Sequence, residues 1–380
     1  MVDYSLKSDF VKELDKDIMN LIETGYKRDV NESEFNDLAL REFELQYNTN
    51  KPYRKYCEKR NVAPKDISSW GGIPAIPTDA FKYADLACFP IEQAEKTFIS
   101  SGTTNPEKRG KYYVDKDGLE IYNKAVLVTT KEYLFPDIEK IKILALSPPP
   151  QALPNMGMAN GIGLWMREYG TEGSKFLIGR EGLDTKTFFE SLKEAEKTNE
   201  SVAIIGASFG FVHLFDNYEQ RGLTFNLPNR SRVLDGGGYK GKSREVPKEE
   251  FFSKFPKIFG LPEEYCVNLL AMTEGASQYF DNVLRNKLRG VSEPRYKPNH
   301  PWTRTIAVDP ESLERLPKGE KGILRYYDLA NRSTVLAVQT DDIGYEIGNG
   351  FEILGRAVGA EPRGCSMAIE ELIEATKSGE

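Results

Sequence analysis

Histidine and cysteine are scarce in this chain of 380 residues, which contains two histidines and four cysteines. The cysteines form no Cys-x-x-Cys pair, and their spacing does not match the ligand spacing of a zinc site. A structural zinc site is therefore not expected. The cysteines are Cys57, Cys88, Cys266 and Cys365, and the histidines are His213 and His300.

Long hydrophobic runs are also missing. No stretch approaches the roughly 18 apolar residues that a membrane-spanning helix needs. Residues 1–30 carry charges throughout and have no apolar core of the kind found in a signal peptide. The net charge of -7 argues against a general nucleic-acid binder, which usually presents a basic field. We therefore expect a cytoplasmic protein that neither spans a membrane nor binds nucleic acid.

A serine-hydrolase signature is matched at Gly206, Ser208 and Gly210, which follow the order Gly-x-Ser-x-Gly. In hydrolases this motif turns a strand into a helix and exposes the serine. A Ser-His-Asp triad is hard to build from only two histidines. A serine hydrolase is therefore a minor alternative.

The hydrophobic pattern predicts an α/β protein. Phe10, Leu14, Ile18 and Leu21 recur at helical spacing and predict helices within residues 1–60. Further along, short apolar runs alternate with helical patterns, which is typical of a mostly parallel sheet. We expect strands at 141–147, 175–179, 202–207, 232–235 and 266–271, and helices at 184–197, 211–221 and 248–259.

The pattern changes from about residue 300. Strands are predicted at 322–329, 333–339 and 345–354, with connections too short for crossover helices. This β-rich portion covers residues 300–350, and a final amphipathic helix is predicted at 367–377. We expect one large domain over residues 1–350 and a short mobile C-terminal segment over residues 351–380.

Residues 98–109 form a candidate phosphate loop, Phe-Ile-Ser-Ser-Gly-Thr-Thr-Asn-Pro-Glu-Lys-Arg. Glycine allows the backbone to approach a ligand closely, hydroxyl and N–H groups donate hydrogen bonds, and the cations neutralise charge. We expect a triphosphate here, and a solvated Ser/Thr turn is the alternative. The candidate ligand-binding residues are Ser100, Ser101, Gly102, Thr103, Thr104 and Lys108, with Arg109 as a second possible cation.

Two further motifs follow predicted strands. Gly236, Gly237 and Gly238 precede Tyr239 and offer a bare backbone surface for a planar ring. Thr273 and Glu274 place a hydroxyl group beside a carboxylate. Both motifs lie where the ligands of α/β sheets usually bind, at the carboxyl ends of strands.

Two motifs near the end of the β-rich portion complete the pattern. Thr340, Asp341 and Asp342 present carboxylates at a predicted turn, where they suit ribose hydroxyl groups. Arg356 follows Gly355 where the chain leaves the β-rich portion. A solvated acidic turn is the alternative interpretation of residues 340–344.

The order of these motifs resembles that of the adenylate-forming enzymes, from about residue 70 to residue 356. Within that superfamily the chain is most similar to the LuxE-type acyl-protein synthetases, over nearly its whole length. The similarity lies in WGGIPAIPTDAFK, GASFGFVHLF, LDGGGYKG, LLAMTEG, DLANRSTVLAVQTDDIGY and LGRAVGAEPRGCSMAIEEL. Asn105 and Leu270 depart from the pattern, which usually has glycine and tyrosine there.

The resemblance implies an adenylate-forming-enzyme-like large α/β domain, with parallel sheets flanked by helices and a β-rich subdomain, but without the large C-terminal lid domain. It also implies ATP and Mg²⁺ as cofactors and a carboxylic acid as substrate, which we expect to be a fatty acid. Ser100 to Thr104 would hold the β- and γ-phosphates, and Thr273 the α-phosphate. Glu274 would hold Mg²⁺, Asp342 the ribose hydroxyls, and Arg356 the ribose or phosphate edge. The lid lysine of the superfamily has no counterpart, so the cation that replaces it stays open.

Cys365 is the predicted acyl-carrying nucleophile. It follows Arg363 and Gly364 and precedes Ser366, a residue type that often caps a helix. A thiol beside an arginine at a helix N-terminus has a stabilised thiolate. The resemblance implies that the acyl group passes from the adenylate to this cysteine and then to a partner acyl-group reductase. A structural or merely exposed thiol is the alternative.

Two other functions remain open at this point. An acid–CoA ligase of the phenylacetate–CoA ligase type shares the phosphate-loop features and would release acyl-CoA. A non-catalytic nucleotide-binding scaffold for a reductase would agree with Asn105 and Leu270.

Overall fold

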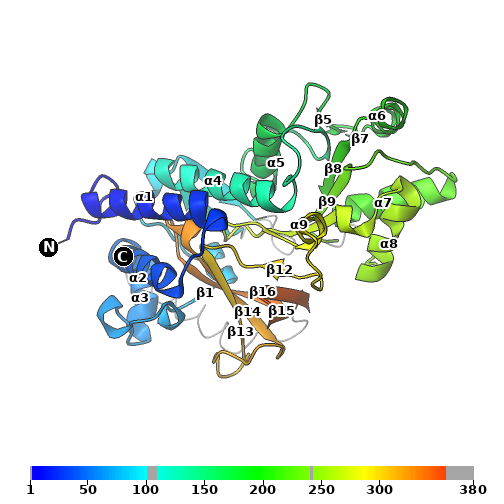
Figure 1. Cartoon of the computed structure of the whole chain (residues 1–380). Coiled ribbons are helices and arrows are strands. Elements are labelled where there is room, and N and C mark those ends of the chain that lie inside the picture. The colour runs from blue at the N-terminus through cyan, green and yellow to red at the C-terminus, as the bar shows by residue number, and fades with distance from the viewer. Residues whose placement is uncertain (1, 101–108, 240–242, 357–380) are drawn as a thin grey trace. The chain divides into compact units, whose positions relative to one another are not determined.

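The computed structural model describes residues 2–100, 109–239 and 243–356, which form two compact units (Figure 1). The first unit comprises the residues up to 128, the segment Met272–Ser277 and the residues from 296 on. The second unit comprises Thr129–Ala271 and Gln278–Arg295. Helix α4 (Lys116–Tyr133) begins in the first unit and ends in the second.

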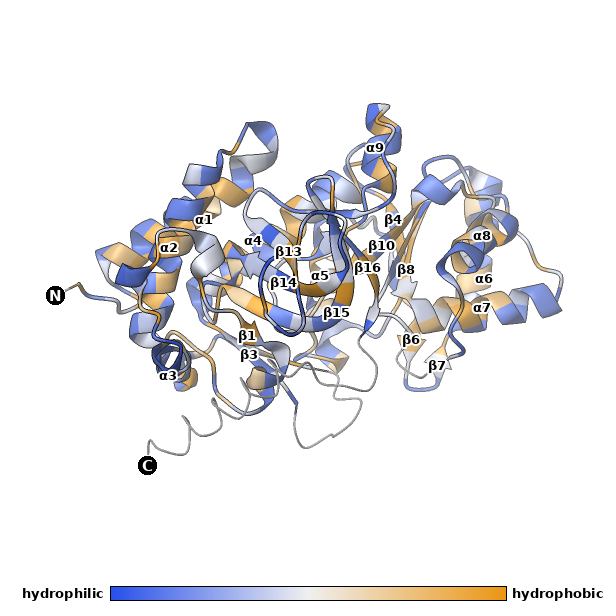
Figure 2. Ribbon diagram, turned by 90° about the horizontal axis from the view of Figure 1, so that it is seen from below, coloured by the Kyte–Doolittle hydropathy of each residue, from blue (hydrophilic) through white to orange (hydrophobic). Residues whose placement is uncertain are grey.

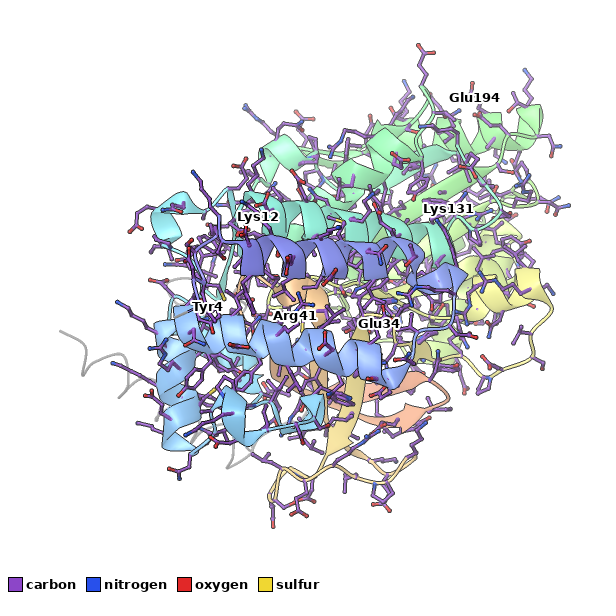
Figure 3. The ribbon with its side chains drawn as sticks, turned by 60° about the vertical axis from the view of Figure 1, so that its left-hand side comes forward. Tyr4, Lys12, Glu34, Arg41, Lys131 and Glu194 are labelled. Atoms are coloured by element: carbon purple, nitrogen blue, oxygen red, sulfur yellow. The ribbon has the colours of Figure 1, made fainter. Side chains whose placement is uncertain are left out.

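The predicted N-terminal helices are confirmed. They are α1 (Asp9–Thr24), α2 (Glu32–Thr49) and α3 (Lys51–Lys59), and each begins after a side chain that accepts a hydrogen bond from the first turn, namely Ser8, Asn31 or Asn50. Helices α1 and α2 run side by side, and Figure 3 shows polar side chains on their outer faces. Arg41 on α2 lies 2.8 Å from a carboxylate oxygen of Asp17 on α1. Leu14, Ile18 and Leu21 are buried on the opposite side, as their spacing predicts.

The sheet of the first unit is mainly an antiparallel meander. Among the described residues it has six strands, in the order β12-β16-β15-β14-β13, with β1 paired in parallel to β15. A separate hairpin joins β2 (Lys96–Ile99) to β3 (Lys111–Val114). The sheet strands are β1 (Ile76–Pro77), β12 (Lys297–Pro298), β13 (Thr303–Val308), β14 (Gly322–Asp328), β15 (Ala337–Ile347) and β16 (Gly350–Arg356).

The predicted acidic turn at residues 340–344 is wrong, because these residues lie inside β15. The pairing of β14 with β15 is shifted between Ile323 and Arg325, so that residues 340–342 face the single residue Leu324. This irregularity is a bulge, which turns side chains out of the regular alternation of a strand. Asp and Gly are typical of turns, but here pairing with β14 and β16 satisfies the backbone and the strand continues.

The predicted strand at 333–339 begins only at Ala337, because a short 3-10 helix (Leu329–Asn331) and buried polar residues precede it. The strand expected at 345–354 is divided between the end of β15 and β16, which leaves the reversal between the two strands at Gly348 and Asn349. Residues 351–356, the start of the expected C-terminal segment, pair with β15 in the sheet. The predicted division between a large domain (1–350) and a C-terminal segment (351–380) stays a prediction.

A buried carboxylate, Asp328, ties the segment Met272–Ser277 to this sheet. One of its oxygens accepts a hydrogen bond from the backbone N–H of Ser277 at 2.8 Å, and the other accepts one from the Ser277 hydroxyl at 2.8 Å. Trp302 donates its indole N–H to the same hydroxyl oxygen at 2.9 Å. All three side chains are buried, so the loss of one partner would leave another polar group unpaired.

A second contact holds the same segment one residue earlier. The backbone N–H of Ala276 donates to the side-chain oxygen of Asn331 at 2.7 Å. Asn331 is itself buried in the 3-10 helix that follows β14. Two consecutive amides are therefore bound to side chains of the first unit, which fixes the chain immediately after Thr273 and Glu274.

The second unit contains the predicted parallel sheet. Among the residues described there, six strands follow the order β11-β10-β9-β8-β4-β5. Every neighbouring pair is parallel except β10 with β11. The strands are β4 (Lys142–Leu146), β5 (Lys175–Phe176), β8 (Val202–Ala207), β9 (Arg232–Gly236), β10 (Cys266–Leu270) and β11 (Tyr279–Phe280). The strand expected at 175–179 is interrupted, and its end forms β6 (Ile178–Gly179), which pairs with β7 (Gly182–Leu183).

Three helices share a core with this sheet. The helices α6 (Thr185–Thr198), α7 (Ser208–Gln220) and α8 (Lys248–Phe259) bury phenylalanine and leucine side chains together with Leu144, Ile204 and Val233 of the strands. Figure 2 shows hydrophobic residues along the strands and both polar and apolar residues on the helices, as expected for helices that cover a sheet. The remaining helices are α5 (Gly157–Glu168) and α9 (Val283–Arg289).

Helix α7 begins three residues earlier than predicted, at Ser208, directly after β8. Residues Ile162, Leu164 and Trp165 of α5 are buried. Within the described ranges, no helix combines the length and apolar character needed to cross a bilayer.

Replacing Asp328 by asparagine is expected to lower the free energy of unfolding by roughly 1–3 kcal/mol, because an amide N–H₂ would face the Ser277 donors. Urea denaturation measures this change. The control is Asp37→Asn, since Asp37 is 68% exposed on its side chain and pairs with Arg41 only at 3.6 Å. Equal stability of the two variants would contradict the anchoring role.

The same pair of proteins gives a pH test. Burial raises the pKa of Asp328 from 3.8 to about 6, although hydrogen bonds from Ser277 and Ala330 lower it. Between pH 3.8 and about 6, the Asp328 carboxyl group is protonated in the folded protein and ionised in the unfolded chain. The stabilisation that this bound proton gives the folded protein is therefore lost as the pH rises through that range. The stability of the wild type relative to Asp328→Asn should therefore decrease from pH 5 to pH 7 and then level off. A constant difference would show that Asp328 does not titrate in this way.

Candidate active site

Ser100 and Gly110, on either side of the expected phosphate loop, are held together by strand pairing. Ile99 at the end of β2 lies opposite Lys111 at the start of β3. The backbone N–H of Ser100 donates to the carbonyl of Gly110 at 2.9 Å, and the N–H of Gly110 donates to the Ser100 hydroxyl oxygen at 2.9 Å. The other predicted residues of the loop lie outside the described residues: Ser101, Gly102, Thr103, Thr104 and Lys108.

Glu274 reaches the same place from a distant part of the sequence. A Cβ atom on Gly110 would lie 3.0 Å from Oε1 of Glu274, 3.4 Å from Cβ of Phe81 and 3.5 Å from Oγ of Ser100. Glycine at position 110 therefore leaves room for the carboxylate. The structure brings together two residues that the sequence predicted in separate motifs, Ser100 and Glu274.

Charges of both signs surround Glu274. Burial raises the pKa of its carboxyl group, while the positive charges of Lys82 and Arg356 lower it and the charge of Asp79 raises it further. Thr273, the predicted α-phosphate contact, is half-buried beside it. A carboxylate that loses water contacts but keeps nearby cations is typical of a functional site rather than of a solvated surface.

Asp342 and Arg356 are paired as neighbours across two strands. They are directly opposite in the pairing of β15 with β16, and Nε of Arg356 lies 3.3 Å from a carboxylate oxygen of Asp342. Burial raises the pKa of Asp342, and Arg356 lowers it. The Asp342 backbone N–H donates to the Thr340 hydroxyl oxygen at 3.1 Å, and that hydroxyl donates to the Leu324 carbonyl at 3.1 Å. The bulge therefore has a defined geometry, with Asp342 half-buried and Asp341 exposed.

Two charged residues of the site were not identified from the sequence, Asp79 and Lys82. They lie in the 3-10 helix η4 (Thr78–Lys82), which directly follows β1. Their charges, with that of Arg356, influence the pKa of Asp341 as well as that of Glu274. In the sequence, the two residues lie in the run Thr-Asp-Ala-Phe-Lys after an Ile-Pro pair. This run has no hydrophobic periodicity from which a helix or strand could be predicted.

The predicted glycine run belongs to the second unit. Gly236 ends β9, and Gly237 and Gly238 have φ angles of 81° and 62°, which favour glycine because other residues rarely adopt them. A Cβ atom on Gly238 would have no neighbour within 4 Å, so its backbone is bare as predicted. The ring of Tyr239 packs edge-on against Phe251, and its hydroxyl donates to a backbone carbonyl at 2.8 Å. The base-contacting roles of these residues stay predictions.

The described cysteines are poor nucleophiles. Cys57, Cys88 and Cys266 are buried. Burial raises the pKa of Cys57 and of Cys88 to about 12 and that of Cys266 well above its usual value, which keeps the thiols protonated. The predicted nucleophile Cys365 lies outside the described residues, as does the helix expected after it.

Glu274 suits Mg²⁺ as a single carboxylate ligand. Among the residues that the structure describes, no group of three or more histidine, cysteine, aspartate or glutamate side chains is arranged to hold a metal ion. Mg²⁺ is usually held by one or two carboxylates, substrate phosphates and water rather than by a cage of protein ligands. The residues present therefore fit a Mg²⁺ ion that arrives with a nucleotide.

The fold is that of the adenylate-forming ligases. The crystal structure of an open conformation of 2-hydroxyisobutyryl-CoA ligase, in complex with 2-HIB-AMP and CoA, superposes with a TM-score of 0.60 over 85% of this chain and 75% of the ligase. The crystal structure of the same ligase in the postadenylation state superposes with a TM-score of 0.60 over 84% of this chain and 67% of the ligase. The sequence identities are 14% and 13%, so this similarity concerns the fold alone.

The family model of the acyl-protein synthetases, LuxE, matches residues 4–374, and the chain belongs to this family. It is 27% identical over 358 residues to the long-chain-fatty-acid–luciferin-component ligase of Aliivibrio fischeri, which covers 90% of both chains. The corresponding ligase of Vibrio harveyi is 24% identical over 348 residues, 89% of this chain and 87% of the relative. The predicted family, fold class and enzyme class, an ATP-dependent ligase, are therefore confirmed.

The serine-hydrolase alternative does not agree with this family. Ser208 does lie where a strand turns into a helix, between β8 and α7, but its side chain is buried. His300 is also buried, and its ring lies 2.5 Å from the hydroxyl oxygen of Tyr26. The Gly-x-Ser-x-Gly order at residues 206–210 is thus part of the packing around β8.

Substituting Gly110 by alanine is expected to lower the rate of acid-dependent pyrophosphate release by about tenfold, because the new methyl group would displace the Glu274 carboxylate. The thermal midpoint should stay within about 2 °C, since Glu274 can move. The control is Gly179→Ala, where a Cβ atom would have no neighbour within 4 Å. Wild-type rates in both variants would mean that the position of Glu274 is unimportant.

Proposed function

We propose that the protein activates a fatty acid with ATP, carries the acyl group as a thioester on Cys365 and passes it to a partner acyl-group reductase. The observation that carries the proposal is the match to the acyl-protein synthetase family over residues 4–374. A long-chain acid as substrate is supported by the names of the two ligases from Aliivibrio fischeri and Vibrio harveyi.

In the first step, a carboxylate oxygen of the acid attacks the α-phosphorus of ATP. The new P–O bond forms as the bond to the bridging oxygen of the β-phosphate breaks, and pyrophosphate leaves. Such a step depends on positioning and charge neutralisation rather than on covalent help from the protein. Thr273 would contact the α-phosphate and Arg356 the ribose or phosphate edge, while Ser100 would lie at the β- and γ-phosphates with the predicted loop residues that follow it.

Glu274 is the residue proposed to hold Mg²⁺, which when bound supplies positive charge to the phosphate oxygens. Asp342 is proposed to accept hydrogen bonds from the ribose hydroxyls, a role that needs its ionised form. Burial raises the pKa of both carboxyl groups, and Arg356 lowers it. Arg356, the neighbour of Asp342 across the strands, is thus the cation that favours the ionised form.

In the second step, the thiolate of Cys365 attacks the carbonyl carbon of the acyl-adenylate. A C–S bond forms, the C–O bond to the phosphate breaks, and AMP leaves with both electrons of that bond. Arg363 and the predicted helix after Ser366 would stabilise the thiolate. The three buried cysteines, with their raised pKa values, are not suited to this step. The acyl group would then pass to the partner reductase, with the Cys365 thiolate as the leaving group, and a hydride donor bound by that reductase would reduce it by two electrons to the aldehyde.

Replacing Cys365 by serine is expected to abolish hydroxylamine-labile labelling of the protein by a radioactive fatty acid and ATP, while pyrophosphate is still released. Gel autoradiography before and after hydroxylamine treatment measures the label, and a phosphate-coupled assay measures pyrophosphate. The control is Cys57→Ala, which removes a buried thiol and should leave labelling intact.

Three outcomes would overturn the proposal. Labelling that survives Cys365→Ser would reject this cysteine as the acyl carrier. Acylation of added CoA with an unlabelled protein would indicate an acid–CoA ligase. No pyrophosphate release with any carboxylic acid would indicate a non-catalytic nucleotide-binding scaffold.

A further inference from the structure

Lys82 ends the stretch WGGIPAIPTDAFK, which carries part of the family resemblance, but no role in the site was predicted for it. It ends the 3-10 helix η4, which follows β1, and β1 pairs with β15 at Val338 and Gln339. The next residues of β15 are those of the bulge, 340–342. Lys82 is therefore carried to the site by long-range strand pairing and not by proximity in the sequence.

The residue before Lys82 lies where the β- and γ-phosphates are proposed to bind. Phe81, the residue before Lys82, lies beside the position of a Cβ atom on Gly110, together with Ser100 and Glu274. Burial raises the pKa of Glu274 and of Asp341, and the charge of Lys82 lowers both. The ammonium group thus acts electrostatically on both carboxylates.

Arg356, the other cation of this group, is held elsewhere. It lies opposite Asp342 in the strand pairing, at 3.3 Å from its carboxylate, and its side chain is 81% exposed. Its ion pair is therefore with the carboxylate assigned to the ribose. Four carboxylates lie in this group with two cations, so an incoming triphosphate gains from a cation that can turn toward it. The carboxylates are those of Asp79, Glu274, Asp341 and Asp342.

The ion pair of Lys82 can be exchanged at little cost. Nζ of Lys82 lies 2.6 Å from Asp79, three residues earlier, and the side chains are 28% and 32% exposed. A pair that solvent reaches contributes at most about 1 kcal/mol. A phosphate is a stronger partner for an ammonium group, since charge-assisted hydrogen bonds to it are shorter and about twice as strong as neutral ones.

We propose that Lys82 is a phosphate-binding residue whose ammonium group leaves Asp79 when ATP binds and pairs with the β- and γ-phosphates beside Ser100. Before the exchange, Asp79 is the carboxylate that pairs with the lysine, at 2.6 Å. This inference rests on the proposed ATP-dependent activation, and it adds a phosphate-binding cation to the predicted Lys108 and Arg109.

Isothermal titration of the full chain with MgATP and with AMP tests the proposal. In Lys82→Met the affinity for ATP should fall by about 10- to 100-fold, as expected for a charge-assisted hydrogen bond worth about 1.5–3 kcal/mol. The affinity for AMP, which lacks the β- and γ-phosphates, should stay within about twofold, and Lys82→Arg should retain most of the affinity for ATP because it keeps the charge. The control is Lys65→Met, which replaces an exposed lysine of another 3-10 helix (Pro64–Asp66) in the same unit.

Asp79→Asn tests the same exchange of partners by changing the carboxylate instead of the lysine. It frees Lys82 and removes one negative charge, so the affinity for ATP should be unchanged or several-fold higher. A loss of ATP affinity equal to that of Lys82→Met would overturn the proposal and make the ion pair a structural contact. Wild-type ATP affinity in Lys82→Met, or equal losses for ATP and AMP, would overturn it as well.

The same measurements separate this inference from the proposed function. If the wild type binds MgATP through Lys82 but releases no pyrophosphate with any acid, the proposed activation fails and the lysine assignment stands. If the wild type forms the acyl-enzyme and Lys82→Met binds ATP normally, the lysine assignment fails alone. Transfer of the acyl group from synthetic acyl-adenylate to Cys365 should be unaffected in Lys82→Met, because that step involves no pyrophosphate.

Discussion

The hydrogen bonds that Asp328 and Asn331 make to the backbone of Ala276 and Ser277 are the constraint on which the candidate site depends. They attach the segment Met272–Ser277, which continues from a strand of the second unit, to the first unit. Because Asp328 and Asn331 are buried, the segment cannot be released without leaving polar groups unpaired. Glu274, a few residues before these contacts, therefore lies beside Gly110 and the charges of η4 and β16.

Strand pairing supplies the other half of the site. The pairing of β2 with β3 holds Ser100 next to Gly110. The pairing of β15 with β16 places Arg356 opposite Asp342, and the pairing of β1 with β15 brings η4 to the bulge. Backbone ladders resist displacement more than exposed ion pairs do. The site thus combines fixed carboxylates and hydroxyls with one exposed lysine–aspartate pair, an arrangement suited to binding a charged ligand without rearranging the sheet.

The sequence predicted well what local patterns encode. The spacing of Leu14, Ile18 and Leu21 gave the first helix, and the alternation after residue 140 gave a parallel sheet, because periodicity reports which face is buried. It failed at residues 340–344, where turn-forming residue types occupy a strand bulge stabilised by partners distant in sequence. It also missed Lys82, because a single turn of 3-10 helix has no period and the link to Glu274 is made by tertiary contacts. The resemblance to the family identified the motifs of the site, which the local properties of the residues could not distinguish from ordinary turns and loops.

The most direct test of the account is exchange of labelled pyrophosphate into ATP. If the Glu274 site forms an acyl-adenylate, exchange should require a fatty acid and should not require Cys365, because the activation step is reversible without the thiol. It should be lost in Glu274→Gln and kept in Glu249→Gln, a change of an exposed glutamate in α8. Absence of exchange with every fatty acid, or exchange that persists in Glu274→Gln, would contradict the central claim that this site activates the acid.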